Sequence, residues 1–340
     1  MLILTVIYLG KKLPRYVSDN LEYLRTTFPN DDLYFISDSP RSIARANKIG
    51  IKTWLAPDVD EQWKDVRARM AHPMEFRGGF WFKTLARIFV LNSFMQLHPD
   101  QSVLQIEADV FLFPNFPLIK FKGLEADIAF PMESSKAGIA SLLFLKNHVT
   151  SEQLMNIALR EIEKNRELTD MLLLGKVALS HEMNFLPLPT LPSHMKSALN
   201  EPGAASLICS DTLDLSGVFD GISVGQYLLG IDPRNSRGSL ILHRSQASHA
   251  INVDKLIINV DNNGNILLKD PQGDASVYNL HNHAKDLKLY KASTRKILLE
   301  KRVNSSTQGE SREFVTAIFV LAVFKAIMRR VQNGLRRIKY

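Results

Sequence analysis

The sequence predicts an α/β protein in which a mixed sheet is flanked by helices. Over residues 1–55, short apolar runs alternate with stretches of helical periodicity. A long helix expected over residues 80–97 is followed at once by another apolar run, residues 103–106, which suits a central strand. That run ends in two carboxylates, Glu107 and Asp109, and ligands of such sheets bind at the carboxyl ends of strands.

The first 55 residues have the order strand, helix, strand, helix, strand. Strands are expected over residues 2–8, 33–36 and 51–55, and helices over residues 16–28 and 43–49. The second strand delivers Ser37 and Asp38 at its carboxyl end. This order is typical of a nucleotide-binding sheet. Neither GxGxxG nor the Walker sequence occurs, so a Rossmann dinucleotide site and a P-loop are unsupported.

Residues 56–79 are polar and predicted to be irregular, with Gly78 and Gly79 as a flexible hinge before the helix over 80–97. On that helix Lys83 and Arg87 are four residues apart, so they share a face. Paired basic residues on a helix are ordinarily solvated. Because this helix directly precedes the acidic strand end, both charges are also expected to approach the same site.

Two carboxylates one residue apart at a buried strand end are costly without a partner. A hard divalent cation is a suitable partner for Glu107 and Asp109, since Mg²⁺ or Mn²⁺ takes one or two carboxylates and completes its shell with phosphate oxygens and water. The alternative is a strand end with two solvated acids, and the motif alone does not decide between them.

In the middle of the chain, strands are expected over residues 126–130 and 139–145, helices over 152–163 and 169–179, and an extended segment over 185–192. Thr169 is a plausible N-cap. One interpretation of Asp170 is therefore the common one, an acid at a helix start that interacts with the helix dipole. His181 and Glu182 superficially resemble HExxH. The second histidine is missing, which rejects a zincin site.

Residues 219–235 are dense in glycine and polar side chains, which would allow close backbone approach to a ligand. Asp220 and Gln226 are candidates to bond sugar hydroxyls, and a plain glycine-rich loop is the alternative. Residues 256–260 and 266–268 flank a clear hairpin turn. Residues 278–285 then place His281 and His283 on one side of an extended run with Lys285 in phase, offering an imidazole to a metal and an ammonium to a diphosphate.

Composition sets outer limits on compartment and partners. Cys209 is the only cysteine of the 340 residues, which excludes an intramolecular disulfide and a cysteine-based zinc site and fits a reducing compartment. Residues 1–9 lack a basic start and a cleavage site, so we expect a strand there and not a signal peptide. Of the net charge of +7, the segment 314–340 supplies six positive charges and no negative one. The nearly neutral body argues against nucleic-acid binding.

The last 40 residues change character. Residues 300–313 are polar and predicted to be a linker that follows a catalytic domain over 1–299. The apolar run 314–324 is short of the ~20 residues that a spanning helix needs. With its arginines, segment 314–340 is predicted to be a basic amphipathic helix lying on an anionic membrane surface. The alternative is a terminal helix packed on the body.

Taken in order, these segments resemble the metal-dependent glycosyltransferases of the GT-A fold, with a nucleotide-sugar-binding sheet, over roughly residues 1–290. The nearest likeness is to glycogenin-like and bacterial capsular or surface-polysaccharide enzymes. The acidic motif here is Glu-Ala-Asp and departs from Asp-x-Asp at its first position. The resemblance implies that Asp109 binds the metal, Glu107 supports the metal or contacts the ribose, and His281 completes the metal shell.

The same resemblance implies the donor contacts. Lys285 is similar to the lysine on the donor diphosphate, although its spacing from His281 is shorter than in glycogenin. Asp38 falls where such enzymes recognise the nucleoside, and Lys83 and Arg87 fall on the helix that reaches the donor phosphates. The stretch containing Asp220 and Gln226 is expected to hold the sugar or the acceptor.

The implied activity is transfer of a sugar, with Mn²⁺ or Mg²⁺, from a nucleotide-sugar, most simply a UDP-sugar, to a glycan or lipid-linked acceptor in surface polysaccharide synthesis. This places the protein in the cytoplasm, peripheral on the inner face of the membrane. An inverting enzyme needs a carboxylate base, for which Asp170, Glu182 and Asp220 are candidates. A retaining hexosyltransferase, which the glycogenin likeness favours, needs little more than an amide such as Gln226.

Two other functions stay open. One is a non-catalytic glycan-binding or scaffold protein that kept the fold while its acidic motif drifted. The other is a nucleotidyltransferase, which usually carries a glycine-rich basic loop after the first strand. Residues 10–13 are a poor version of such a loop. Donor turnover that depends on a metal separates the transferase from the scaffold.

Overall fold

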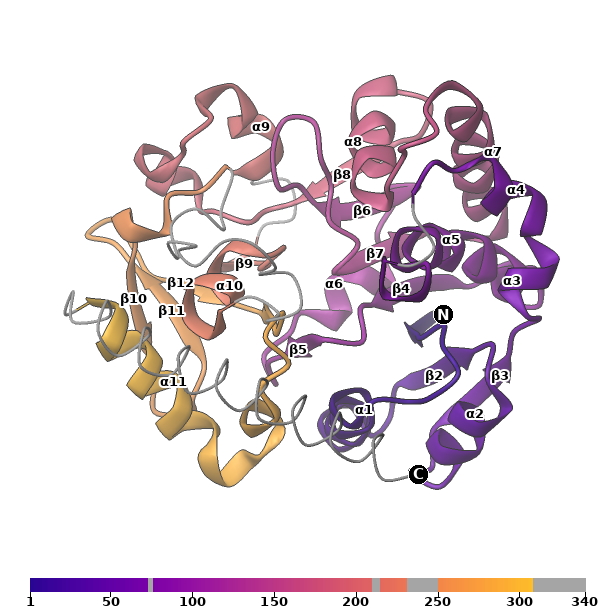
Figure 1. Ribbon diagram of the computed structural model, residues 1–340. Coiled ribbons are helices and arrows are strands. Elements are labelled where there is room, and N and C mark those ends of the chain that lie inside the picture. Colours follow the sequence, from indigo (N-terminus) through magenta and orange to yellow (C-terminus); the bar gives the residue numbers. More distant parts are fainter. Residues whose placement is uncertain (73–75, 210–214, 231–249, 308–340) are drawn as a thin grey trace, which may run out of the picture.

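A mixed seven-stranded sheet forms the centre of the computed structural model, which describes residues 1–72, 76–209, 215–230 and 250–307 (Figure 1). Its strands run in the order β3-β2-β1-β4-β7-β6-β8. The first four are parallel, β7 is antiparallel to β4, and β6 is antiparallel to β7. The strands of this sheet are β1 (Leu2–Ile7), β2 (Asp32–Ser37), β3 (Lys52–Leu55), β4 (Ser102–Ile106), β6 (Ile128–Pro131), β7 (Leu142–Leu145) and β8 (Phe185–Leu188).

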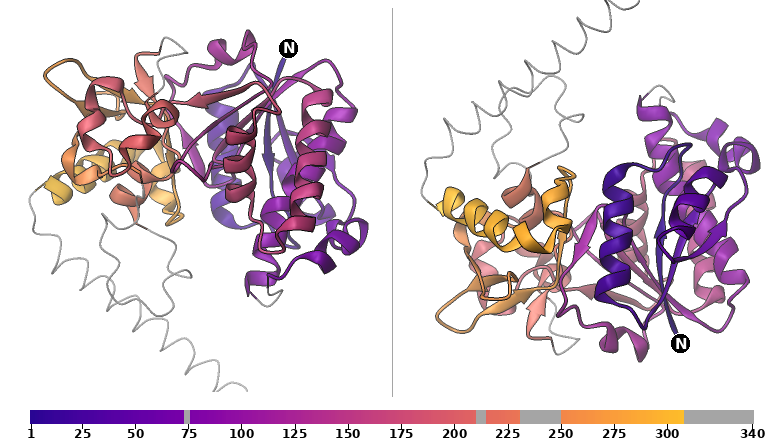
Figure 2. Two further views of the ribbon diagram at one scale, coloured as in Figure 1. Left: turned by 90° about the horizontal axis from the view of Figure 1, so that it is seen from above. Right: turned by 90° about the horizontal axis from the view of Figure 1, so that it is seen from below.

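Helices cover both faces of this sheet (Figure 2). One face packs on α1 (Arg15–Thr27), α2 (Pro40–Asn47) and α6 (Leu118–Lys122) through a core that includes Leu4, Leu21 and Phe121. The other face packs on α5 (Phe80–Gln96), α7 (His148–Lys164) and α8 (Asp170–Ser180) through a core that includes Phe89 and Leu154. The expected α/β architecture, with a mixed sheet flanked by helices, is therefore confirmed.

The segment between β3 and α5 was predicted to be irregular, and that prediction was wrong for its first half. Two short helices, α3 (Val59–Gln62) and α4 (Lys64–Arg69), lie there, and Asp58 caps the first by accepting a hydrogen bond from the amide of Asp60. Val59 and Val66 are buried in the core, which explains why a polar segment becomes helical. Gly78 and Gly79 have φ angles of 67° and 77°, a left-handed lead into α5 that glycine adopts without strain.

A second, smaller layer lies beside the main sheet (Figure 1). Its sheet has the order β10-β11-β12-β9, and the predicted hairpin is present as β10 and β11. A two-stranded ribbon, β5 with β13, connects this layer to the carboxyl end of β4. The remaining elements are β5 (Val110–Leu112), β9 (Gly217–Val218), β10 (Ile257–Val260), β11 (Ile266–Lys269), β12 (Ala275–Val277), β13 (Asn279–His281), α9 (Ala205–Ile208), α10 (Ser223–Leu229) and α11 (Ala292–Thr307).

Helix α11 corrects one expected boundary. Residues 300–307, predicted to open a linker, are its last two turns, and Leu299 and Val303 are buried against the core. The predicted amphipathic segment 314–340 lies outside the described residues. Within the described ranges, none of the helices is long and apolar enough to cross a membrane.

Candidate metal centre

Three side chains from two distant parts of the sequence converge at the carboxyl end of β4. Glu107 and Asp109 follow β4 directly, and His281 is the last residue of β13. The β5–β13 ribbon pairs Val110 with His281, which brings the histidine beside Asp109. One ligand atom from each of the three residues lies within 4.8 Å of the others. The group that the sequence pointed to as metal ligands is therefore assembled in space.

Each of the three side chains directs one atom inward and has its other polar atom held from behind. Glu107 Oε1 accepts a hydrogen bond from Arg87, while Oε2 lies 3.6 Å from His281 Nε2. Asp109 Oδ2 accepts from the Lys285 ammonium at 2.8 Å, while Oδ1 lies 3.7 Å from His281 Nε2. Such outer partners orient metal ligands and fix which atom faces the ion.

The ring of His281 is oriented by the same logic. Its Nδ1 lies 2.8 Å from the carbonyl oxygen of Gly221, which only accepts, so Nδ1 carries the proton and donates. In the neutral imidazole this leaves a lone pair on Nε2, the atom that faces the carboxylates. Two carboxylate oxygens suit Mg²⁺ and Mn²⁺, and the imidazole adds preference for a transition metal. The donor set therefore fits Mn²⁺ well.

The charges around the site keep the Asp109 carboxylate ionised. Burial by itself raises the pKa of Asp109. The Lys285 ammonium and His281 lower it by more than burial raises it, so the pKa of Asp109 lies well below its ordinary value. An ionised carboxylate is the form that binds a cation.

Arg87 lies behind the ligands and not in front of them. Its guanidinium donates to Glu107 Oε1 at 2.6 Å, to Asp170 Oδ2 at 2.9 Å and, through Nε, to the carbonyl oxygen of Thr84 at 3.2 Å. Burial lowers the pKa of this guanidinium, yet the carboxylates of Glu107 and Asp170 raise it more. The sequence predicted that Arg87 contacts the donor phosphates. In this structure all three nitrogens of its guanidinium donate to protein oxygens.

Asp170 opens α8, and the prediction that Thr169 caps this helix is confirmed, because its side chain accepts from the amide of Leu172. Burial raises the pKa of Asp170, and the neighbouring Arg87 partly offsets that rise. Its carboxylate forms an ion pair with the guanidinium of Arg87 at 2.9 Å.

Lys285 reaches Asp109 through a tight turn, not an extended run. The amide of His283 donates to the carbonyl oxygen of His281 at 2.8 Å, and Lys285 has a φ angle of 57°. The prediction that His281, His283 and Lys285 are in phase on a strand was therefore wrong beyond His281. The chain bends there because Asn282 binds it from several sides.

Asn282 is a site residue that the sequence reasoning missed. It is fully buried, its amide donates to the carbonyl oxygen of Asp109 at 2.7 Å, and its carbonyl oxygen accepts from Lys285 at 2.7 Å. Its side chain donates to Tyr290 and exchanges hydrogen bonds with the backbone of Asp286. An asparagine after the histidine, before a lysine and an aspartate, is a turn signal that would have identified it.

Asp220, a candidate base, is engaged by the backbone. Oδ1 accepts from the amide of Val224, and Oδ2 accepts from the amides of Gly225 and His281, at 2.8 to 2.9 Å. Burial raises the pKa of Asp220, and these amides offset part of that rise. The carboxylate thus ties the start of α10 to β13, and the expected glycine-rich loop is helical over Ser223–Leu229. Gln226 lies buried on that helix.

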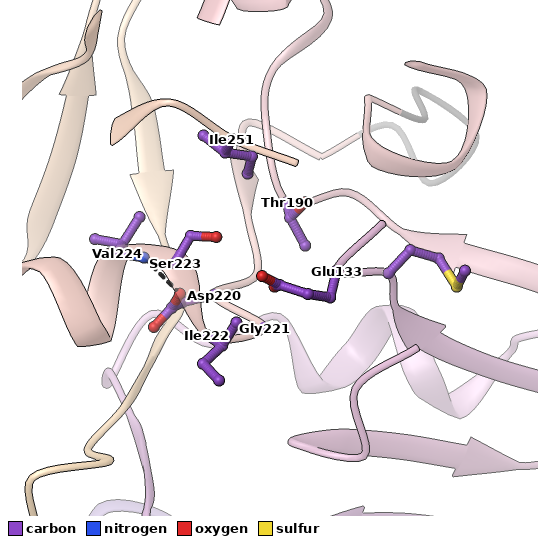
Figure 3. A pocket seen from close by; sticks show the side chains of 9 residues that line it. Glu133, Thr190, Asp220, Gly221, Ile222, Ser223, Val224 and Ile251 are labelled. Atoms are coloured by element: carbon purple, nitrogen blue, oxygen red, sulfur yellow. Dashed lines mark hydrogen bonds between the residues drawn. The ribbon is translucent and has the colours of Figure 1, made fainter. Parts of the chain in front are cut away.

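A small cavity lies beside this anchor (Figure 3). Its volume is about 10 Å³, which is the space of one water molecule. Glu133 and Thr190 face Asp220 and Ser223 across it. Thr190 Oγ1 is buried and has no hydrogen-bond partner among the described residues. The cavity is far too small for a sugar ring, so placement of the sugar near Asp220 stays a prediction.

Three other predicted site residues lie elsewhere. Asp38 directly follows β2 and accepts a hydrogen bond from the amide of Gly10 at 2.9 Å. Burial raises the pKa of Asp38, and Gly10 and Lys83 partly offset that rise. Lys83 therefore acts electrostatically on Asp38. Glu182, a candidate base, is exposed and forms an ion pair with Arg160 at 2.6 Å.

No protein-family model matches the sequence, and no curated protein matches it either. Two solved structures that the chain resembles are both of the galactosyltransferase LgtC. One is a complex with donor and acceptor sugar analogues. The match covers 56% of this chain and 73% of the LgtC chain, with 10% sequence identity and a TM-score of 0.37. The other, an active-site mutant, shares 11% over 58% and 78%, with a TM-score of 0.39. Likeness at this level is too weak to support a statement about activity.

Proposed function

We propose that this chain is a metal-dependent glycosyltransferase that moves a sugar from a nucleotide-sugar, most simply a UDP-sugar, to an acceptor hydroxyl. The observation that carries the proposal is the centre formed by Glu107, Asp109 and His281. Each ligand directs one atom inward while Arg87, Lys285 or the carbonyl oxygen of Gly221 holds the other. A divalent cation bound there would stabilise negative charge developing on a departing nucleoside diphosphate.

The residues around the centre take the following roles in this proposal. Lys285 adds a second positive charge beside the cation, where it meets the diphosphate. Asp38 lies at the carboxyl end of β2, the position at which a nucleotide-binding sheet meets its ligand, and it recognises the nucleoside. Gln226 serves a retaining reaction as the nearby amide. Asp220 holds the backbone of His281 in place and is not a base.

The acceptor and cellular setting come from the sequence resemblance and are part of the proposal. The acceptor is a glycan or a lipid-linked glycan in surface polysaccharide synthesis. The basic segment 314–340 attaches the enzyme to an anionic membrane from the cytoplasmic side. Donor chemistry can be tested without knowing either.

The experiment is release of nucleoside diphosphate from a panel of UDP- and GDP-sugars with Mn²⁺, with Mg²⁺ and with a chelator. We expect slow hydrolysis of one donor that requires the metal and is lost in Asp109→Asn. Silence across the panel, together with calorimetry that shows no metal-assisted nucleotide binding, would reject the enzyme in favour of the scaffold protein. Release of pyrophosphate instead of nucleoside diphosphate would identify a nucleotidyltransferase.

A further inference from the structure

We propose that Arg87 and Asp170 are a positioning pair that sets the orientation and the effective charge of Glu107 in the metal centre. Neither residue touches the donor in this role. The proposal rests on the metal centre of the proposed function and reassigns two residues for which the sequence suggested phosphate binding and base catalysis.

The geometry of the guanidinium supports the positioning role. Its two terminal nitrogens each donate to one carboxylate, and Nε donates to the carbonyl oxygen of Thr84, one turn earlier in α5. The side chains of Arg87, Glu107 and Asp170 are only 13%, 15% and 8% exposed, so water competes little for these contacts. A planar fork anchored at three points allows Glu107 one orientation, with Oε2 toward His281.

Charge explains why a second carboxylate is present. Arg87 alone would neutralise Glu107 and reduce the attraction of Glu107 for a cation. Asp170 lies on the opposite side of the guanidinium and compensates its charge, so the three residues together keep one negative charge. Asp109 adds a second negative charge, and Lys285 is the one positive charge that opposes these two. Asp170 thus acts on the metal through Arg87 and without contact.

Outer partners of metal ligands are worth roughly 10- to 100-fold in affinity. Asp170→Ala removes both the charge and the acceptor, and Arg87→Lys removes the fork, so each is expected to raise the Kd for Mn²⁺ at least tenfold. Asp170→Asn keeps an acceptor for Arg87 and loses only the charge, so we expect a rise in Kd that is smaller than in Asp170→Ala and larger than in the controls. A general base would behave differently, because its loss leaves metal affinity intact and lowers turnover by about 10²- to 10⁴-fold.

The test is a titration of the full chain with Mn²⁺ followed by electron paramagnetic resonance, without donor. The matched controls are Glu182→Gln and Arg160→Lys, which change a carboxylate–arginine pair on the surface. We expect both controls to bind Mn²⁺ within twofold of wild type. Circular dichroism and thermal unfolding establish that each variant is folded, and Asp170→Asn supplies the result if Asp170→Ala does not fold.

Two results overturn the proposal. One is wild-type Mn²⁺ affinity in Asp170→Ala and Arg87→Lys, and the other is full metal binding with turnover abolished in Asp170→Asn, which would identify a base. A wild-type chain that binds no Mn²⁺ overturns both the pair and the proposed function. If wild type binds Mn²⁺ but turns over no donor, the transferase fails, while the titrations still decide the role of the pair.

Discussion

Gly225 lies where α10 touches the metal centre, and replacing it with alanine tests whether that contact positions His281. A Cβ at residue 225 would lie 2.4 Å from the carbonyl oxygen and 2.9 Å from the amide nitrogen of His281, and 2.6 Å from Asp220 Oδ2. Two of these three atoms are backbone, and the third already binds two amides. No flexible side chain is available to move aside, so α10 and β13 must separate.

The magnitude follows from the two effects that separation has. Overpacking of this kind costs about 1–3 kcal/mol. Weakening one hydrogen bond to the Asp220 carboxylate, from the amide of Gly225 or of His281, costs about 1.5–3 kcal/mol. Because the effects overlap, we expect Gly225→Ala to lower the free energy of unfolding by about 3 kcal/mol, which lowers the Tm by roughly 5 °C or more. Displacement of His281 should also weaken Mn²⁺ binding about tenfold.

Thermal unfolding and Mn²⁺ titration of the same preparation measure both effects. Gly203→Ala is the matched control, since a Cβ there meets nothing within 4 Å and its φ angle is not positive. We expect Gly203→Ala to stay within about 0.5 kcal/mol of wild type. A Gly225→Ala protein with unchanged Tm and unchanged Mn²⁺ affinity would refute the claim that this contact holds the histidine.

Three further changes have defined outcomes. Asn282→Ala leaves the turn before Lys285 without its buried side-chain bonds, and we expect a loss of about 2–3 kcal/mol in chemical denaturation together with weaker nucleotide binding in calorimetry. Asp38→Asn keeps an acceptor for Gly10 and loses the charge, so the donor KM should rise about tenfold while kcat changes little. The lysines beside Glu161, through hydrogen bonds from Lys164 and Lys176, lower its pKa below the usual 4.5. A lowered pKa stabilises the fold above 4.5 and loses that contribution as pH falls through the folded-state pKa, so Glu161→Gln should cost about 1 kcal/mol at pH 7 and progressively less in acid.

The carboxylates that the sequence placed at one strand end share a physical property. Apolar runs that stop at charged residues mark strand ends, and the carboxyl end of a central strand is a predictable place for a ligand. Glu107 and Asp109 were therefore found from local pattern alone. Their meeting with His281 depends on the β5–β13 ribbon, which the pattern of apolar residues does not encode.

The contacts that the sequence could not predict are those made with a tertiary partner. Arg87 has the spacing of a phosphate-binding residue, but its charge is compensated by Asp170, which lies 83 residues away. Asp220 has the residue type of a base, and its oxygens are bound by backbone amides that only the fold supplies. Glu182 lies on the surface because α8 ends just before it. None of these contacts leaves a periodic pattern or a fixed spacing in the sequence from which it could be predicted.

The β5–β13 ribbon also fixes when the site can exist during synthesis. Asp109 leaves the ribosome about 170 residues before His281 and Lys285, its two contacts in the centre. Until the later segment arrives, the carboxylates of Glu107 and Asp109 lie near Arg87 and Asp170 but without the histidine or the lysine. Closing so long a loop is slow compared with forming the first parallel strands. A nascent chain that has folded its large sheet thus still lacks the candidate metal centre, and the complete site can form only after residues 281–285 have emerged.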